Sequence, residues 1–262
     1  MSTVTFSPPF HSPSQVVEQL RGHGYAVLQP RDVATWLNCD LEALQALSVE
    51  WDDLPPDEHL KDGGSYRYRR HASFVVQGEQ LEWVEHRPHW QPLKYNALHG
   101  GMERWFAPVK ARVVQQAAWQ QLIVRLAEVS SQLFAQAMTE PCFVEAHQFR
   151  IDTANGIGRP TPEGAHRDGV DLVAVFLVGR QGIKGGETRI FEASGPTGIR
   201  FTLTEPWTLM LLDDARMIHE TTPIQPLDEH MSGTRDTLVV TCRQHCFQGG
   251  EVLWPVTKSG ER

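Results

Sequence analysis

EGAHRDGVD at residues 163–171 runs directly into the apolar segment LVAVFLV at residues 172–178. His166 and Asp168 stand two residues apart just ahead of this segment, so both lie at the mouth of an expected strand. One further histidine that returns to the same place completes a set of three metal ligands, and His219 is the candidate. The fold therefore has to bring these three side chains together.

Short apolar segments separated by glycine and proline surround this stretch. We expect strands at 143–151, 170–178, 187–192, 199–203, 207–212, 221–224 and 234–243. Segments of this length with turn residues between them are typical of a β-sandwich or barrel. No helical pattern lies between them, which argues against a parallel βαβ arrangement.

The N-terminal part predicts helices and a few strands. Ser12, Pro13 and Gln15 form a helix-start pattern. Leucine and valine recur at helical spacing within residues 108–139, which predicts a helix covering one face of the sheet. The expected structure is mainly β with flanking helices: a single domain over residues 1–262, in which residues 1–140 pack on a core formed by residues 141–248.

Composition narrows the possible partners. Hydrophobic residues make up 40% of the chain, charged residues 21%, and the net charge is -8, as in ordinary soluble globular proteins. The acidic balance argues against nucleic acid and favours a small molecule. The sequence contains no apolar run of membrane-spanning length and starts without a signal pattern, so we expect a cytoplasmic protein that does not bind membranes.

The sequence around His166, Asp168 and His219 supports their interpretation as metal ligands. A His-x-Asp pair alone is expected by chance in a chain of this composition. Here the pair precedes an apolar strand, and His219 falls where one apolar strand ends and another begins. His166, Asp168 and His219 can thus form a facial triad of two histidines and one carboxylate, which leaves positions open for non-haem Fe(II) chemistry.

The last expected strand carries an arginine that needs an explanation. Alternation places Arg235, Thr237 and Val239 on one face, with Leu238 on the other. Burying an arginine on such a strand is costly unless an anion pairs with it. We therefore predict that Arg235 anchors an anion, with the Thr237 hydroxyl nearby. An exposed arginine at a strand start is the alternative interpretation, and Arg243 on the same face is the alternative anchor.

These motifs, in this order, resemble those of the Fe(II)/2-oxoglutarate-dependent dioxygenases. The resemblance rests on His166-x-Asp168, Gly185-Gly186-Glu187-Thr188, His219 with Thr222-Pro223, and Arg235-x-Thr237. Further strings resemble more narrowly the branch typified by L-isoleucine dioxygenase, which hydroxylates free amino acids: they are His147-Gln148-Phe149-Arg150-Ile151, residues 160–169, and Tyr95-Asn96 with Gly100-Gly101.

The resemblance implies a double-stranded β-helix (jelly-roll, cupin-like) core in which His166, Asp168 and His219 hold Fe(II). It also implies 2-oxoglutarate as cosubstrate, with Arg235 and Thr237 at its far carboxylate, and O2 as oxidant. The implied reaction hydroxylates a C–H bond of a free L-amino acid or close derivative and releases succinate and CO2. Two alternatives stay open: the same chemistry on another small molecule, and a cupin-like metal- or ligand-binding protein without turnover.

Substrate residues are inferred from the same segments. Arg67 and Arg69 share one face of an extended segment and, like Arg150, can take a carboxylate, although Arg67 and Arg69 also suit a solvated strand edge. Glu163 can meet an ammonium group. The resemblance places Gln91 and Asn96 along the pocket, where loop packing and turn formation are the alternatives. Neither the amino acid, the carbon oxidised, its stereochemistry nor the oligomeric state follows from the sequence.

Overall fold

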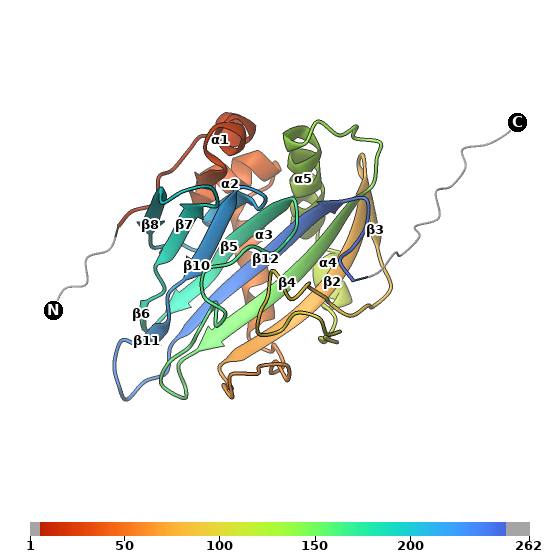
Figure 1. Ribbon diagram of the computed structural model, residues 1–262. Helices are drawn as coiled ribbons and strands as arrows, with labels where there is room; N and C mark the ends of the chain where they lie inside the picture. The colour runs from red at the N-terminus through yellow and green to blue at the C-terminus, as the bar shows by residue number, and fades with distance from the viewer. Residues whose placement is uncertain (1–5, 250–262) are drawn as a thin grey trace, which may run out of the picture.

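The computed structural model describes residues 6–249, and an antiparallel seven-stranded sheet forms its centre (Figure 1). Across the sheet the strands are β1 (Tyr25–Leu28), β9 (Leu209–Asp213), β5 (Leu172–Gln181), β12 (Thr234–Gln244), β4 (Cys142–Asp152), β2 (Arg67–Gln77) and β3 (Gln80–Trp83). The central strand β5 begins with a continuous run of seven buried apolar residues, which suits a sheet covered on both faces.

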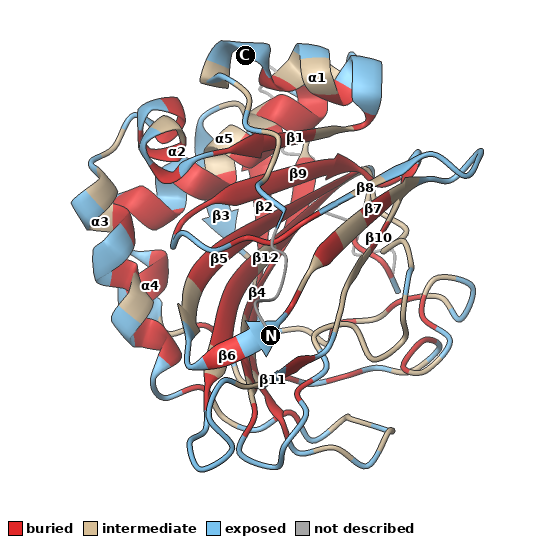
Figure 2. Ribbon diagram, turned by 90° about the vertical axis from the view of Figure 1, so that its left-hand side faces the viewer, coloured by how far each residue is buried: buried red, intermediate tan, exposed pale blue. Residues whose placement is uncertain are grey.

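Two smaller sheets face the large one. One consists of β10 (Met217–Thr221), β7 (Thr188–Glu192) and β8 (Gly198–Phe201), and the other of β11 (Ile224–Pro226) and β6 (Ile183–Gly185). In Figure 2 the helices cover one face of the large sheet, and β7, β8 and β10 lie on the other side. The predicted double-stranded β-helix core is confirmed, and its open space lies between the facing sheets.

Helices close the opposite face. They are α1 (Val16–His23), α2 (Pro30–Leu37), α3 (Leu41–Ala46), α4 (Ala111–Val114) and α5 (Ala117–Leu133), with 3-10 turns at Pro13–Gln15 and Leu47–Trp51. The predicted helix over 108–139 is shorter than expected, because the extended backbone of Gln116 separates α4 from α5. The apolar stripe of α5, which includes Leu122 and Leu126, is buried in the core as predicted. No helix of residues 6–249 is long and apolar enough to cross a membrane.

The side chains of strand β12 alternate between the two faces of the large sheet. Leu238, Val240 and Cys242 belong to the core beneath the helices. Arg235 and Thr237, with Val239 and Thr241, line a cavity on the other face. This is the alternation predicted from the sequence.

Two expectations about element boundaries differ from the structure. The strand expected at 221–224 is instead the end of β10 and the start of β11, interrupted at Pro223, which has no N–H to donate. Residues 1–140 do not only pack on the sheet, because β1, β2 and β3 are members of it. This arrangement puts side chains of β2 into the cavity.

Candidate metal centre and substrate cavity

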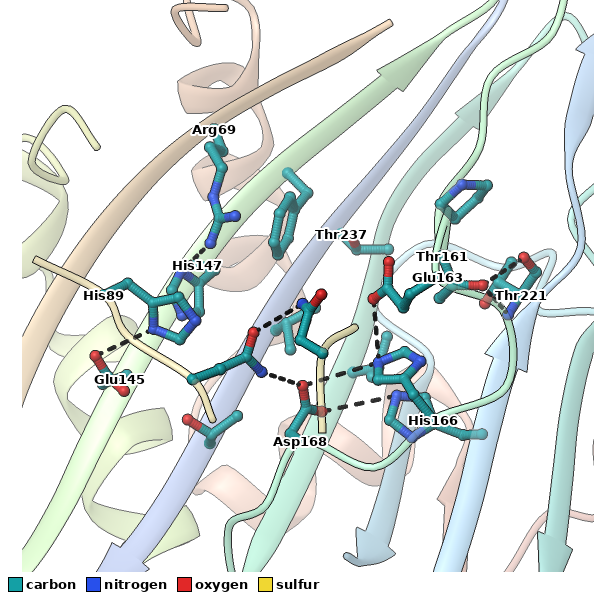
Figure 3. A pocket seen from close by; sticks show the side chains of 18 of the residues that line it. Arg69, His89, Glu145, His147, Thr161, Glu163, His166, Asp168, Thr221 and Thr237 are labelled. Carbon is teal, nitrogen blue, oxygen red and sulfur yellow. Dashed lines mark hydrogen bonds and ion pairs between the residues drawn. The ribbon is translucent and has the colours of Figure 1, made fainter. Parts of the chain in front are cut away.

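His166, Asp168 and His219 meet at one side of the cavity between the sheets (Figure 3). One ligand atom from each side chain lies within 4.8 Å of the other two. Nε2 of His166 is 3.9 Å from Asp168 Oδ1, and Nε2 of His219 is 3.8 Å from Asp168 Oδ2. The backbones of the two histidines exchange N–H···O bonds of 3.0 and 2.9 Å, which joins sites 53 residues apart in sequence (219 − 166).

The protonation of the site suits a cation. His166 Nδ1 lies 2.9 Å from the carbonyl oxygen of Gly164, which can only accept, so Nδ1 carries a hydrogen and Nε2 is the atom left to bind a cation. Burial lowers the pKa of His166, but the Asp168 and Glu163 carboxylates outweigh it and the pKa lies above its ordinary value. Burial and the neighbouring His166 hold the pKa of His219 well below its usual range. The carboxylates beside His166 favour a positive charge at this place, and the neutral His219 ring offers a lone pair to a metal ion, so this donor set with an open side fits Fe(II).

A chain of amides and a guanidinium orients Asp168. Gln91 donates Nε2–H to Asp168 Oδ1 at 3.1 Å. The Gln91 oxygen in turn accepts from Asn96 Nδ2 at 3.0 Å and from Arg104 Nη2 at 2.9 Å. Because two donors occupy the oxygen, the amide NH2 of Gln91 must face the carboxylate. Gln91 and Asn96 do line the cavity, but their contacts position a candidate metal ligand.

Asp214 fixes the backbone of residues 168–170, which carries the candidate ligand Asp168. Directly after β9, its carboxylate accepts the backbone N–H groups of Asp168, Gly169 and Val170 at 3.0, 2.7 and 3.1 Å. Burial and the charge of Asp168 raise the pKa of Asp214. Sequence reasoning missed this residue, although a carboxylate at the end of an apolar strand was a usable signal.

Asp214→Ala is expected to weaken Fe(II) binding by about 10- to 100-fold, the usual cost of removing a group that orients a metal ligand. The backbone of residues 168–170 loses its acceptor, so Asp168 is held less firmly. Anaerobic Fe(II) titration measures the effect, with the exposed Asp228→Ala as control. Equal affinities for the two variants contradict this role of Asp214.

Arg235 lies at another wall of the cavity, on the strand face that also carries Thr237. Arg235 is 4% exposed, and its Nε has no hydrogen-bond partner among the described residues. Burial and the adjacent Arg180, its register partner on β5, lower the pKa of Arg235 to about 10. A Cβ at Gly186 would lie 2.9 Å from Arg180 Nη1, so glycine leaves room for the paired arginines. Two close guanidinium groups with unmet hydrogen bonds form an anion site that fits a carboxylate.

Opposite charges line the rest of the cavity. Glu163 Oε1 is 3.4 Å from His166 Nε2, and its Oε2 is buried with no hydrogen-bond partner in the described part of the chain. Arg67 donates Nε–H to Asp57 at 2.7 Å. Its Nη2, like Nε of Arg104, is buried and has no partner within residues 6–249. Glu163, Arg67 and Arg104 all line the same cavity and retain unused hydrogen-bonding capacity there.

Arg69 is held differently. Its guanidinium carbon is 3.6 Å from the centroid of the Phe106 ring and 4.3 Å from that of Phe149, and Nη2 lies 2.7 Å from His147 Nδ1. Arg69 lines the cavity, but aromatic rings and His147 already engage its guanidinium, and its buried Nε has no partner within residues 6–249.

Two arginines considered from the sequence lie outside this cavity. Arg150 forms ion pairs with Asp236 at 2.8 Å and Asp52 at 3.0 Å on the other face of β4, so the structure does not bring it to the site. Arg243 donates to the Cys246 carbonyl at 3.3 Å and borders a separate surface pocket. Of the two candidate anchors, only Arg235 lines the cavity.

Comparisons with solved structures find the same architecture. A BsmA homologue from Methylobium petroleophilum is 50% identical, with 94% of this chain and 99% of that chain covered and a TM-score of 0.86. IDO from Bacillus thuringiensis is 15% identical, with 94% and 100% covered and a TM-score of 0.72. The Fe(II)/α-ketoglutarate-dependent dioxygenase TqaL is 18% identical, with 91% and 88% covered and a TM-score of 0.68. No curated protein sequence matches the chain.

The sequence profile of the 2OG-Fe dioxygenases matches residues 48–241, which is most of the chain and includes all three candidate metal ligands. The cofactors of such an enzyme are Fe(II), 2-oxoglutarate and O2, in agreement with the His/Asp group at the cavity. With this match, and with a fold shared over nearly the whole length, the chain belongs to the 2OG-Fe dioxygenase family.

Proposed function

We propose that this enzyme hydroxylates a C–H bond of a free L-amino acid or a close derivative. In this proposal His166, Asp168 and His219 hold Fe(II), while Arg235 and Thr237 hold the far carboxylate of 2-oxoglutarate. Glu163 takes the ammonium group of the substrate, and Arg67 with Arg104 takes its carboxylate.

The observation that carries the proposal is the unused charge in the cavity. Glu163 keeps one buried carboxylate oxygen unpaired beside a candidate metal ligand. Arg67 and Arg104 keep buried N–H groups unpaired in the same cavity. Groups of this kind are costly to bury alone, and a zwitterion satisfies both signs at once. The resemblance of residues 147–151 and 160–169 to the L-isoleucine dioxygenase branch independently supports an amino acid.

In this proposal, some cavity residues position the substrate and others exclude water. Bound Fe(II) with 2-oxoglutarate and O2 supplies the oxidising chemistry, with succinate and CO2 as co-products. Glu163 fixes one end of the substrate close to His166, so the carbons near the amino group lie near the metal. Val175, Met210 and Val239 give the cavity an apolar wall that keeps water away from the reacting carbon.

Turnover is better supported than ligand binding alone, because the family match covers the ligand segments and the anchor strand. The same chemistry on another small molecule is the competing proposal. Succinate formation that depends on an added amino acid supports the amino acid proposal over this alternative. A small molecule without both an ammonium and a carboxylate group would leave Glu163 or the two arginines without a partner.

Glu163→Gln is expected to raise the KM for the amino acid about 10- to 100-fold, since it removes the negative charge with little change of shape. The KM for 2-oxoglutarate is expected to change by no more than about twofold. Steady-state assays of succinate and hydroxylated product measure both constants. Glu187→Gln is the matched control, because Glu187 pairs with Arg189 outside the cavity.

A second comparison isolates the ammonium contact. Wild type should prefer an amino acid over its 2-hydroxy analogue, and this preference should shrink in Glu163→Gln. An unchanged preference, or an equal rise in the KM for 2-oxoglutarate, contradicts the role given to Glu163.

A further inference from the structure

A second polar cluster lies at the side of the cavity away from His166 (Figure 3). Glu145 and His147 stand two residues apart on the cavity face of β4, and His89 comes from the loop after β3. The ring centroids of His89 and His147 are 4.6 Å apart in an edge-on arrangement. Both histidines are buried in the protein, at 7% and 3% exposure, and both line the cavity.

The neighbours of each histidine decide which nitrogen carries its hydrogen. Arg69 Nη2 lies 2.7 Å from His147 Nδ1 and can only donate, so the hydrogen of His147 is on Nε2. Glu145 Oε1 lies 3.4 Å from His89 Nδ1 and, as an ionised carboxylate, can only accept, so Nε2 of His89 keeps a lone pair. Neither Nε2 has a hydrogen-bond partner among residues 6–249.

The cluster holds these states in place. Arg87 Nη1 and His71 Nε2 each lie 3.0 Å from Glu145 Oε1, which keeps the carboxylate ionised and fixed. Burial lowers the pKa of His89 to about 4, and burial with Arg69 holds the pKa of His147 well below its usual range. Both rings are therefore neutral at physiological pH.

A second metal ion is the first alternative for this cluster, since His71, His89 and His147 offer nitrogen atoms within 4.8 Å of one another. The arginines argue against it. Arg69 donates to His147 Nδ1, so a metal bound at either nitrogen of His147 would have to break this contact: at Nδ1 directly, and at Nε2 because the ring hydrogen would then move to Nδ1. The Arg69 and Arg87 guanidinium groups would also repel a cation. The geometry is better suited to a neutral ligand.

We propose that His89 and His147 form a donor–acceptor pair that recognises a neutral polar group, a hydroxyl or a primary amide, on the side chain of the amino acid substrate. The proposal rests on the proposed function and specifies its substrate class. Such a group can accept from His147 Nε2–H and donate to His89 Nε2. A side-chain carboxylate cannot donate to His89 Nε2 and is repelled by its lone pair. An ammonium group cannot accept from His147 Nε2–H, and an apolar side chain leaves both groups without a hydrogen bond.

Amino acids of matched shape test this directly in the wild-type holoenzyme. The sets are asparagine, leucine and aspartate; glutamine and glutamate; and threonine and valine, compared by kcat/KM for product formation. The best substrate is expected to be a neutral polar member, preferred by about 100-fold over its apolar or charged counterpart. An apolar or charged counterpart that reacts as well overturns the proposal, as does binding of two metal ions per chain. If no amino acid reacts, the proposed function fails together with it.

His147→Phe separates recognition from packing. It keeps the ring but removes the donor, so the preference for the polar member is expected to fall to less than about tenfold. His86→Phe is the matched control, because His86 bonds the Phe106 carbonyl outside the cavity and should leave the preference unchanged. A uniform loss of activity on both members of a set shows that His147 is structural and overturns the proposal.

Discussion

Replacing His219 with alanine is expected to abolish Fe(II)-dependent succinate formation, with a loss of more than about 100-fold. Removing even an outer partner of a metal ligand costs about 10- to 100-fold, and His219 is proposed to bind the metal itself. The remaining pair, His166 and Asp168, would then hold the ion through one short segment only. His230→Ala is the control, because the His230 side chain is 85% exposed and does not line the cavity.

Stability measurements distinguish loss of the ligand from loss of the fold. Added Fe(II) under anaerobic conditions should raise the melting temperature of wild type and of His230→Ala, because the ion binds only the native state. It should leave the melting temperature of His219→Ala unchanged. A visible charge-transfer absorption with Fe(II) and 2-oxoglutarate that persists in His219→Ala contradicts the ligand assignment.

Arg235→Met is expected to raise the KM for 2-oxoglutarate by about 100-fold. Truncating one partner of a buried charge pair costs roughly 2–5 kcal/mol, and methionine keeps most of the packing of the arginine stem. Arg235 is buried with an unpartnered Nε beside the like-charged Arg180. Without 2-oxoglutarate, the free energy of unfolding of Arg235→Met should therefore be no lower than that of wild type, since the variant has lost an unpaired buried charge.

Arg243→Met is the matched control for this change. Arg243 lies on β12, the same strand, yet its guanidinium bonds the Cys246 carbonyl and does not line the cavity. Its KM for 2-oxoglutarate should stay within about twofold of wild type. If the two variants behave in the opposite way, the anion anchor has been assigned to the wrong end of the strand.

The cavity face of the large sheet was predictable from the sequence because strand side chains alternate with period two. That rule placed Arg235 and Thr237 together, while the apolar run at residues 172–178 put His166 and Asp168 at a strand mouth. The same rule also explains the failure at Arg150. Phe149 and Ile151 line the cavity, so the residue between them must point to the other face, where Asp236 receives it.

The supporting residues were not predictable in the same way. Residues 61–106 have no clean periodicity, and only the folded loop brings Gln91 to Asp168 and His89 to Glu145. Asp214 acts through backbone N–H groups, which a residue pattern does not reveal. The strand pairing of β2 with β4, which brings Arg69 to His147, likewise joins segments that no local signal connects.

The most direct test of the central claim is a single-turnover experiment with purified wild-type protein. The enzyme is loaded anaerobically with Fe(II) and 2-oxoglutarate, given a panel of free L-amino acids, exposed to oxygen, and followed by mass detection of every amino acid and of succinate. We predict that one amino acid gains a single oxygen atom and that succinate forms in equal amount. Succinate at the same low level with every amino acid, and no oxygen gained by any of them, would contradict the account.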